Sequence, residues 1–229
     1  MISLGLLGKN INHSKSKSMY EKIYSQKIHY VFFDCVSDDV VPGLDVIFSK
    51  VNGLSITAPY KKHFLNDVAL DSRIAQLLAI NCIRHEGGKY FGTNTDYFAI
   101  CDQIDEFILQ YKKIDWVILG DGTMSFVTRQ ILDKKNQDFT MYSRRTHGKI
   151  EMLKISSRLV GAKLVVINTC SRDFNFSGKI DDSSIFWDFN YNLEYHLNFF
   201  SKSLITYLDG LKLLADQAVY ATRFWNFSI

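Results

Sequence analysis

The residues best suited to catalysis are a lysine and an aspartate in the first half of the sequence, Lys61 and Asp96. An expected strand ends at Thr57. Pro59 forces a turn after it, which places the Lys61 ammonium group near Thr57. A lysine with a lowered pKa can give and take the proton of an alcohol–ketone pair. The plain alternative is an exposed surface ammonium group, because Lys62 follows directly.

Asp96 stands near the start of an expected helix. Its carboxylate could pair with a nearby lysine and help to move a proton, or it could be a plain helix N-cap. Asn81 and Asn94 precede it in the sequence and offer directional amide hydrogen bonds to hydroxyl groups. The three side chains together are suited to a polyhydroxylated ligand.

Two serines near the N-terminus form another candidate group. Ser14 and Ser16 are separated by one residue, so both hydroxyls face the same side if the backbone is extended. They could bind a carboxylate or the hydroxyls of a sugar-like ring. The alternative is an ordinary serine-rich turn or helix cap.

A glycine-rich turn in the second half could bind a dinucleotide. The string WVILGDGTMS predicts a strand, a turn at Gly120 and Gly122 and a helix, with the small Ser125 in place of a third glycine or alanine. Glycines let the backbone approach a pyrophosphate, whose charge then meets backbone N–H groups and the helix dipole. Asp121 places a negative charge in this loop, which predicts weaker phosphate binding. The alternative is a helix-initiating turn without a ligand.

Three residues at the end of the following strand favour NADP as the dinucleotide. Ser143, Arg144 and Arg145 stand just over twenty residues after Gly120, where an NAD site usually carries an acidic residue. A guanidinium group suits the 2′-phosphate of NADP because it binds phosphate through two hydrogen bonds and stacks on adenine. A solvated basic turn is the alternative.

Alternating strands and helices are expected to position these groups. Strands are predicted over residues 2–8, 29–35, 51–56, 116–119, 138–142, 163–167 and 185–187. Helices are predicted over residues 16–26, 38–50, 71–79, 97–111, 125–133 and 209–225, of which the last is the most amphipathic. This alternation predicts an α/β fold with mainly parallel sheets.

The composition of the 229 residues is that of an ordinary globular protein, with a net charge of +3 that is too small to indicate a nucleic-acid partner. Four cysteines without a CxxC pair predict free thiols in a reducing compartment and no metal site. No apolar run approaches the ~20 residues of a membrane helix. The first residues lack the basic region of a signal peptide. We therefore expect a cytoplasmic protein without membrane contact.

Taken together, these strings resemble the shikimate dehydrogenase family, which includes the quinate/shikimate dehydrogenases. The matching strings are HSKS at 13–16, SITAPYK at 55–61, AINC at 79–82, GTNTD at 92–96, GDG at 120–122, SRR at 143–145, INTC at 167–170, DFNY at 188–191 and the closing helix at 209–218. The resemblance implies an N-terminal α/β substrate domain, residues 1–103 and 206–229, and a Rossmann-like NADP-binding domain, residues 104–205. A C-terminal helix would pack back on the first domain.

The same resemblance implies the NADP-dependent, reversible reduction of 3-dehydroshikimate to shikimate, a step of aromatic amino acid biosynthesis, in a cleft between the domains. Lys61 and Asp96 would form the catalytic pair. The small-molecule substrate would be bound by Ser14, Ser16, Thr57, Asn81, Tyr191 and Gln217. NADP would be bound by Gly120, Gly122, Ser125, Ser143, Arg144 and Arg145. The protein would act as a monomer or a homodimer.

The sequence departs from the family pattern at several positions. Lys17 stands in place of a proline and Ser55 in place of an asparagine. Cys82 replaces a threonine and Tyr97 a small residue, and the chain is shorter than typical members. Alternatives that stay open are a paralogue for quinate or another hydroxy acid, with NAD in place of NADP, and a non-catalytic binding or regulatory relative.

Overall fold

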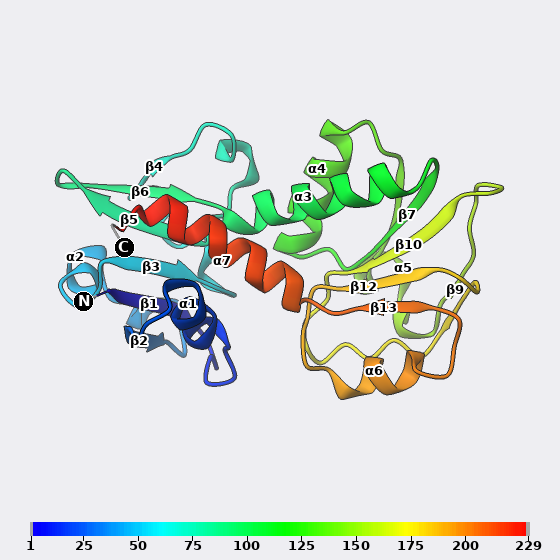
Figure 1. Ribbon diagram of the computed structural model, residues 1–229, viewed down its shortest axis with the longest axis horizontal. Coiled ribbons are helices and arrows are strands. Elements are labelled where there is room, and N and C mark those ends of the chain that lie inside the picture. Colours follow the sequence, from blue (N-terminus) through cyan, green and yellow to red (C-terminus); the bar gives the residue numbers. More distant parts are fainter. Residues whose placement is uncertain (1, 228–229) are drawn as a thin grey trace. The chain divides into compact units, whose positions relative to one another are not determined.

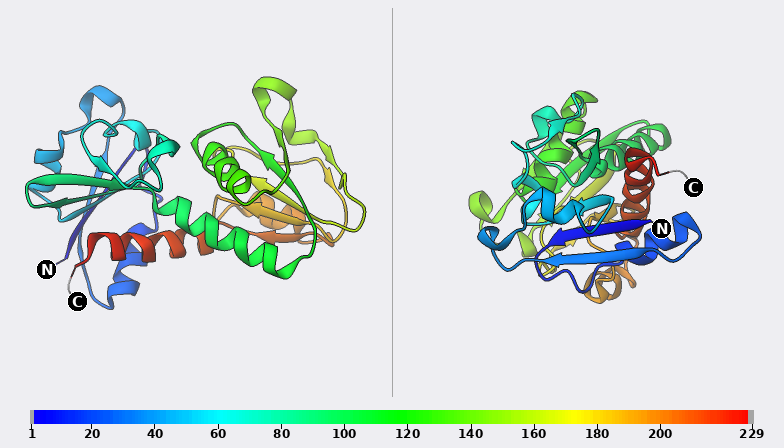
Figure 2. Two further views of the ribbon diagram at one scale, coloured as in Figure 1. Left: turned by 90° about the horizontal axis from the view of Figure 1, so that it is seen from above. Right: turned by 90° about the vertical axis from the view of Figure 1, so that its left-hand side faces the viewer.

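The structure, a computed structural model, describes residues 2–227 (Figure 1). The chain divides into two compact units, of which the first runs to Ala99 and resumes at Leu214, and the second runs from Ile100 to Leu213. Each unit is built on its own β-sheet with helices packed against it (Figure 2). The predicted α/β class, with a Rossmann-like second sheet, is confirmed. No helix of the described residues is long and apolar enough to cross a membrane.

The first unit contains a six-stranded sheet in the order β2-β1-β3-β5-β6-β4. Its strands are β1 (Ser3–Gly8), β2 (His29–Asp34), β3 (Gly53–Ile56), β4 (Ala69–Leu70), β5 (Cys82–Glu86) and β6 (Lys89–Thr93). Strand β1 pairs in parallel with β2 and β3, whereas β5 pairs antiparallel with both β3 and β6. The short edge strand β4 pairs in parallel with β6, so the sheet is mixed, and the prediction of mainly parallel sheets fails only where β5 pairs with its two neighbours.

Three helices belong wholly or largely to the first unit: α1 (Ser16–Tyr24), α2 (Leu44–Phe48) and the C-terminal α7 (Leu211–Trp225). The buried stripe of α7 packs Ala218, Ala221 and Trp225 against the core around Tyr20 of α1. A side chain at Gly53 would meet the Trp225 ring at 2.8 Å, so the glycine leaves room for the indole. The predicted amphipathic helix and its return to the first unit are confirmed.

The second unit contains a five-stranded sheet in the order β13-β12-β10-β7-β8. Its strands are β7 (Ile114–Leu119), β8 (Phe139–Tyr142), β10 (Lys163–Asn168), β12 (Ile185–Asp188) and β13 (Thr206–Leu208). All neighbouring strands are parallel. Strand β7 is buried along its whole length, because a parallel sheet is covered on both faces and takes continuous apolar runs.

The second unit also contains α4 (Thr123–Lys134), α5 (Arg144–His147) and α6 (Glu194–Phe200), and a small two-stranded sheet of β9 (Lys154–Ile155) and β11 (Lys179–Ile180). Helix α3 (Thr95–Gln110) begins in the first unit and continues into the second. It begins two residues earlier and ends one residue earlier than the helix predicted over 97–111. Helix α6 and strand β13 were not among the predicted elements.

Two predicted helices differ in the structure. The helix predicted over 71–79 is wrong, since this segment forms turns with one 3₁₀ turn at Ala75–Leu77, and Leu78 has a φ of 48°. Its apolar side chains at Ile74 and Leu77 are buried all the same, which explains the helix-like spacing. The helix predicted over 38–50 is broken into a 3₁₀ turn at Asp38–Val40 and the short α2. The proline and glycine between them interrupt the helix.

Candidate active site

The end of strand β3 delivers Lys61 to the site. The Thr57 N–H group donates to the Leu7 carbonyl at 2.8 Å, and the Thr57 carbonyl accepts from the Tyr60 N–H group at 3.0 Å. Lys61 lies in the 3₁₀ turn Tyr60–Lys62 that follows. Its own carbonyl accepts from the Ile80 N–H group at 2.8 Å. The backbone that carries the lysine is thus held by its neighbours on both sides.

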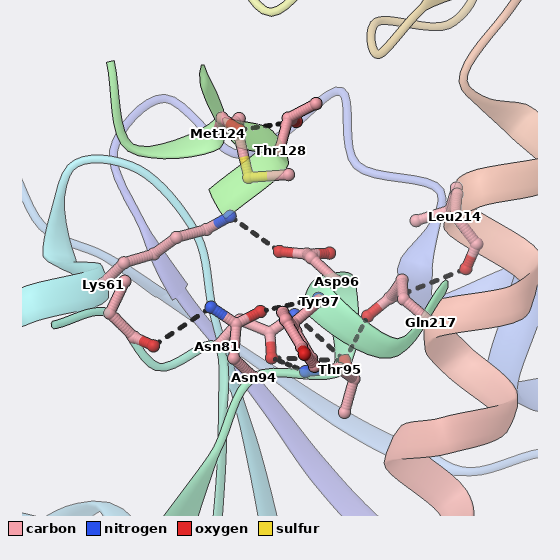
Figure 3. Close-up of polar contacts among 11 residues, drawn as sticks. Lys61, Asn81, Asn94, Thr95, Asp96, Tyr97, Met124, Thr128, Leu214 and Gln217 are labelled. Atoms are coloured by element: carbon pink, nitrogen blue, oxygen red, sulfur yellow. Dashed lines mark hydrogen bonds and ion pairs between the residues drawn. The ribbon is translucent and has the colours of Figure 1, made fainter. Parts of the chain in front are cut away.

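Asp96 lies in the first turn of α3, but it is not the cap of that helix. Asn94 takes this role, because its side-chain oxygen accepts from the Tyr97 N–H group at 3.1 Å. The Asn94 amide also donates to the Ala79 carbonyl at 3.0 Å. The carboxylate of Asp96 is therefore available to another partner, and its Oδ2 lies 2.7 Å from Lys61 Nζ (Figure 3).

The Lys61–Asp96 pair is mostly buried but keeps some contact with solvent. The side chains are 13% and 14% exposed. Partial burial strengthens the attraction between the charges relative to a surface pair, and the remaining exposure leaves room for a reacting group to approach. The geometry suits proton exchange between Nζ and a hydroxyl or carbonyl oxygen, with the carboxylate as the lysine's partner.

A chain of hydrogen bonds beside this pair orients two amide side chains (Figure 3). The Thr95 N–H group donates to Asn81 Oδ1 at 2.7 Å, and Asn81 Nδ2 donates to Thr95 Oγ1 at 3.0 Å. The Thr95 hydroxyl lies 3.1 Å from Gln217 Oε1, to which it can donate. Gln217 Nε2 donates to the Leu214 carbonyl at 3.0 Å. The structure thus brings together Asn81 and Gln217, two of the predicted substrate-binding residues, through a threonine that the sequence analysis missed.

The predicted serine group lies at the start of α1. Ser14 Oγ lies 3.0 Å from Ser16 Oγ, so the two hydroxyls contact each other, and their binding of a ligand stays a prediction. The Ser16 N–H group also donates to Ser14 Oγ at 3.2 Å, which stabilises the turn into the helix. Thr57 is half-buried, and its methyl group packs over Gly8, where an added side chain would meet it at 2.5 Å.

Tyr20 is a buried polar residue that the sequence analysis did not single out. Its hydroxyl hydrogen-bonds to Ser55 Oγ at 3.0 Å. Burial raises the pKa of Tyr20 well above its usual range, while Ser55 and Gln217 act in the opposite direction as hydrogen-bond partners. Ser55, the substitute for the family's asparagine, therefore has a defined partner. The available signal was the position of Tyr20 one helical turn after Ser16 on the apolar face of α1.

The glycine-rich turn between β7 and α4 has the backbone of a phosphate-binding loop. Gly120 has a φ of 111°, and a side chain there would lie 2.7 Å from Thr169 Oγ1. Gly122 precedes the first residue of the 12-residue α4 and has open space where a side chain would stand. The first N–H groups of a helix have no acceptor within the helix itself, and beside open space they fit a pyrophosphate group. These residues therefore fit a dinucleotide.

Two of the predicted cofactor-binding residues have fully buried side chains. Ser125 lies on the inner face of α4, with its hydroxyl 3.7 Å from the sulfur of Met141 in β8. Ser143 caps α5 by accepting from the Thr146 N–H group at 3.4 Å. Both side chains support the packing of the loops, and any contact with a cofactor stays a prediction.

Both predicted phosphate-binding arginines are already paired with carboxylates. Arg144 Nε lies 3.3 Å from Glu151 Oε1, and its guanidinium carbon lies 5.7 Å from the centre of the Phe174 ring. Arg145 Nε lies 3.3 Å from Oδ2 of Asp121, the acidic residue of the glycine-rich turn. The structure thus connects the turn to the arginine segment, 24 residues further along the chain, through an ion pair.

Tyr191 follows β12 in the second unit. Arg172, which the sequence analysis missed, donates from Nη1 to the Tyr191 carbonyl at 2.9 Å and lies over its ring at 5.5 Å. Tyr191 lies in the second unit and Lys61 in the first, so their meeting in one cleft stays a prediction. Within the described part of the chain, no group of three or more His, Cys, Asp or Glu side chains could hold a metal ion.

Known proteins that resemble this chain match it over nearly its whole length. Residues 6–83 match the family model described as the shikimate dehydrogenase substrate binding domain. The NADP⁺-dependent shikimate dehydrogenase of Vesicomyosocius okutanii is 27% identical, over 99% of this chain and 94% of the relative. That of Clostridium botulinum strain 657 is 24% identical, over 98% of this chain and 96% of the relative.

The chain is thus similar to shikimate dehydrogenases along nearly its whole length, and residues 6–83 match the substrate-binding domain of that family. The structure of the shikimate dehydrogenase from Aquifex aeolicus superimposes with a TM-score of 0.77 at 21% identity, covering 99% of this chain and 92% of that one. The Thermus thermophilus enzyme, in complex with NADP(H) and shikimate, gives a TM-score of 0.74 at 18% identity, covering 99% and 94%. The chain therefore has the two-domain fold of these enzymes.

Proposed function

We propose that this protein is an NADP-dependent shikimate dehydrogenase, with Lys61 and Asp96 as its catalytic pair. The observation that carries the proposal is the 2.7 Å contact between Lys61 Nζ and Asp96 Oδ2 in a pair that is shielded yet reachable. A lysine held in this way can exchange a proton with the substrate oxygen while the carbon beside that oxygen changes its oxidation state. When bound, the nicotinamide supplies or accepts the hydride.

In the proposed reduction, Lys61 donates a proton from Nζ to the ketone oxygen, which becomes the hydroxyl group. In the reverse direction the neutral amine takes the proton of the hydroxyl. The Asp96 carboxylate lies 2.7 Å from Lys61 Nζ and keeps it in one position. The turn at Tyr60–Lys62 fixes the backbone that carries Lys61, and the Asn94 cap fixes the backbone that carries Asp96. Less conformational entropy is then lost when the two side chains pair.

The substrate is proposed to be held by polar side chains from several elements. The Asn81 and Gln217 amides, oriented by Thr95, would bind ring hydroxyls directionally. Ser14, Ser16, Thr57 and Tyr191 are proposed to complete the set. The relative from Thermus thermophilus, whose structure holds shikimate, supports a compound of this class as the ligand.

For the cofactor, the backbone at Gly120 and Gly122 would receive the pyrophosphate, and Arg144 and Arg145 the 2′-phosphate. We propose residues 104–205 as the NADP domain and residues 1–103 with 206–229 as the substrate domain, with the reaction between them. The compact units divide near these boundaries, at residues 99/100 and 213/214, which supports the assignment.

The first test is NADPH formation by the purified protein with shikimate and NADP, with quinate and NAD run in parallel. We expect turnover with shikimate and NADP that falls in Lys61→Ala but not in Lys135→Ala. Lys135 is a matched control because its ammonium group pairs with Asp105 at 2.6 Å on the surface of the other unit.

Turnover with quinate or NAD instead would redefine the substrate or the cofactor. A folded protein without turnover for any of these pairs would contradict the proposal. It would favour a non-catalytic binding relative.

A further inference from the structure

The ion pair between the glycine-rich turn and the arginine segment bears on how the cofactor is selected. Asp121, between the two glycines of the turn, has a side chain that is 35% exposed. Arg145, its partner at 3.3 Å, has a side chain that is 79% exposed. The Arg145 guanidinium group is exposed enough for a phosphate to reach it, but it is already paired with the Asp121 carboxylate.

The neighbouring arginine is held differently. Arg144 is in contact both with Glu151, at 3.3 Å, and with the face of the Phe174 ring. Phe174 is buried in the core, so one face of this guanidinium is fixed against it. Arg145 extends into solvent beside the turn and can be redirected at little cost. Of the two arginines, Arg145 is the better placed to bind a phosphate group. That phosphate must displace the Asp121 carboxylate from Arg145.

We propose that Asp121 competes with the 2′-phosphate of NADP for Arg145 and thereby limits the preference of this site for NADP over NAD. The inference rests on the proposed function, because it assumes that a nicotinamide dinucleotide binds at the turn. NADP must separate the Asp121–Arg145 pair, whereas NAD, which lacks the 2′-phosphate, leaves it intact. Both dinucleotides carry the same pyrophosphate, so its repulsion by Asp121 cancels in the ratio of their affinities.

The experiment is direct binding of NADP and of NAD, measured by calorimetry on the full chain. It compares the unsubstituted protein with Asp121→Asn, which keeps the shape of the side chain and removes its charge. We expect Asp121→Asn to tighten NADP binding by roughly three- to tenfold, as removal of one exposed opposing charge should. NAD binding should tighten less than NADP binding, because it gains only the lost repulsion of the shared pyrophosphate, and both gains should shrink at high salt because exposed charges are screened.

Two further variants make the test specific. Asp105→Asn removes one negative charge at the pair with Lys135, so it controls for net charge and should leave both affinities unchanged. Arg145→Ala combined with Asp121→Asn should abolish the excess of the NADP gain over the NAD gain, because the freed guanidinium is then absent. Thermal unfolding of each variant confirms that the fold is intact.

The outcomes separate this inference from the proposed function. Equal tightening of NADP and NAD, or an excess of the NADP gain that survives Arg145→Ala, overturns the inference and leaves the proposed function standing. The same holds if the unsubstituted protein binds NADP and Asp121→Asn changes nothing. If only Asp121→Asn binds NADP, the inference holds and the native protein is not an NADP enzyme. If no variant binds either dinucleotide, both proposals fail.

Discussion

Each unit of the molecule contains an aspartate paired with a basic side chain at 2.7 Å, yet the two pairs have different surroundings. In the first unit, Asp96 meets Lys61 and both side chains keep some exposure. In the second unit, Asp188 Oδ2 meets His196 Nδ1 and both side chains are 0% exposed. Distance alone does not separate a reactive pair from a structural one.

The Asp188 carboxylate is surrounded by donors. Its Oδ1 accepts from Asn168 Nδ2 at 3.0 Å and from the Asn190 N–H group at 2.9 Å. His196 Nε2 accepts from the Phe176 N–H group at 2.9 Å, so the histidine proton is assigned to Nδ1 and donated to Asp188. Every atom of the pair has a partner, and the network joins β10, β12 and α6. It stabilises the fold and has no group left for a ligand.

The comparison indicates that two pairs of equal length can differ in what they allow, because their surroundings differ. A buried carboxylate is tolerated when its lone pairs are all satisfied, and it then stabilises one arrangement of the chain. A pair that stays partly exposed is less costly to separate and can exchange protons with a third group. The following four predictions test this contrast, in order of decreasing expected effect.

The largest expected effect is on catalysis. Lys61→Ala should lower turnover by about 10²- to 10⁴-fold, as expected for the loss of a general acid–base group, while substrate binding is largely kept. The free energy of unfolding should change by about 1 kcal/mol or less, because Asp96 retains access to water. Steady-state kinetics and urea unfolding measure both quantities. Unchanged turnover would remove Lys61 from the mechanism.

His196→Ala should lower the stability of the fold strongly, whereas Lys61→Ala should lower mainly turnover. Removing His196 takes the closest donor from the fully buried Asp188 Oδ2 and leaves the Phe176 N–H group without its acceptor, so the free energy of unfolding should fall by about 3–5 kcal/mol. Urea unfolding measures the change, and His85→Ala, at an exposed histidine of β5, is the matched control. A loss of less than about 1 kcal/mol would mean that the network is not structural.

Thr95→Val should affect both stability and substrate binding, each to a moderate extent. The hydroxyl that links Asn81 to Gln217 is lost while the volume is kept, so we expect a stability loss of about 1–2 kcal/mol and a raised KM for the acid substrate. Thr128→Val is the control, because the buried Thr128 hydroxyl donates to the Met124 carbonyl of its own helix at 2.8 Å. Equal KM values for the two variants would argue against a role of the Thr95 link in substrate binding.

The smallest expected effect is a change in pH dependence at the Asp188 network. Burial raises the pKa of Tyr207, and the charge of Asp188 raises it further. Because the folded pKa lies above the unfolded value of about 10, this contribution to stability is complete below about pH 10 and is lost as the pH rises further. Tyr207→Phe should therefore flatten the alkaline fall in unfolding free energy.

The size of this flattening is up to about 1.4 kcal/mol per pH unit, which is the slope for one proton. Other tyrosines keep part of the fall, since burial also raises the pKa of Tyr24 to about 12. Urea unfolding between pH 7 and 11 compares the slopes. Identical slopes for Tyr207→Phe and the unsubstituted protein would contradict the prediction.

Much of the fold could be predicted from local patterns. The continuous apolar runs at β7 and β10 indicated buried parallel strands, and the amphipathic stripe of α7 indicated a helix packed on a core. The hairpin between β5 and β6 was missed although Gly87 and Gly88, both with positive φ, are a typical two-residue turn. The helix predicted over 71–79 was wrong, because turns can bury the same apolar side chains.

The sequence by itself determined the α/β class, the likeness to the shikimate dehydrogenase family and the residue types at the candidate site. These depend on local spacing, turn chemistry and short strings, which can be read along the chain. Only the tertiary structure decided that Asn94 caps α3 and leaves Asp96 to Lys61, that Thr95 joins Asn81 to Gln217, and that Asp121 occupies Arg145. Such pairings join residues far apart along the chain, and their chemistry depends on burial and on which donors are already used.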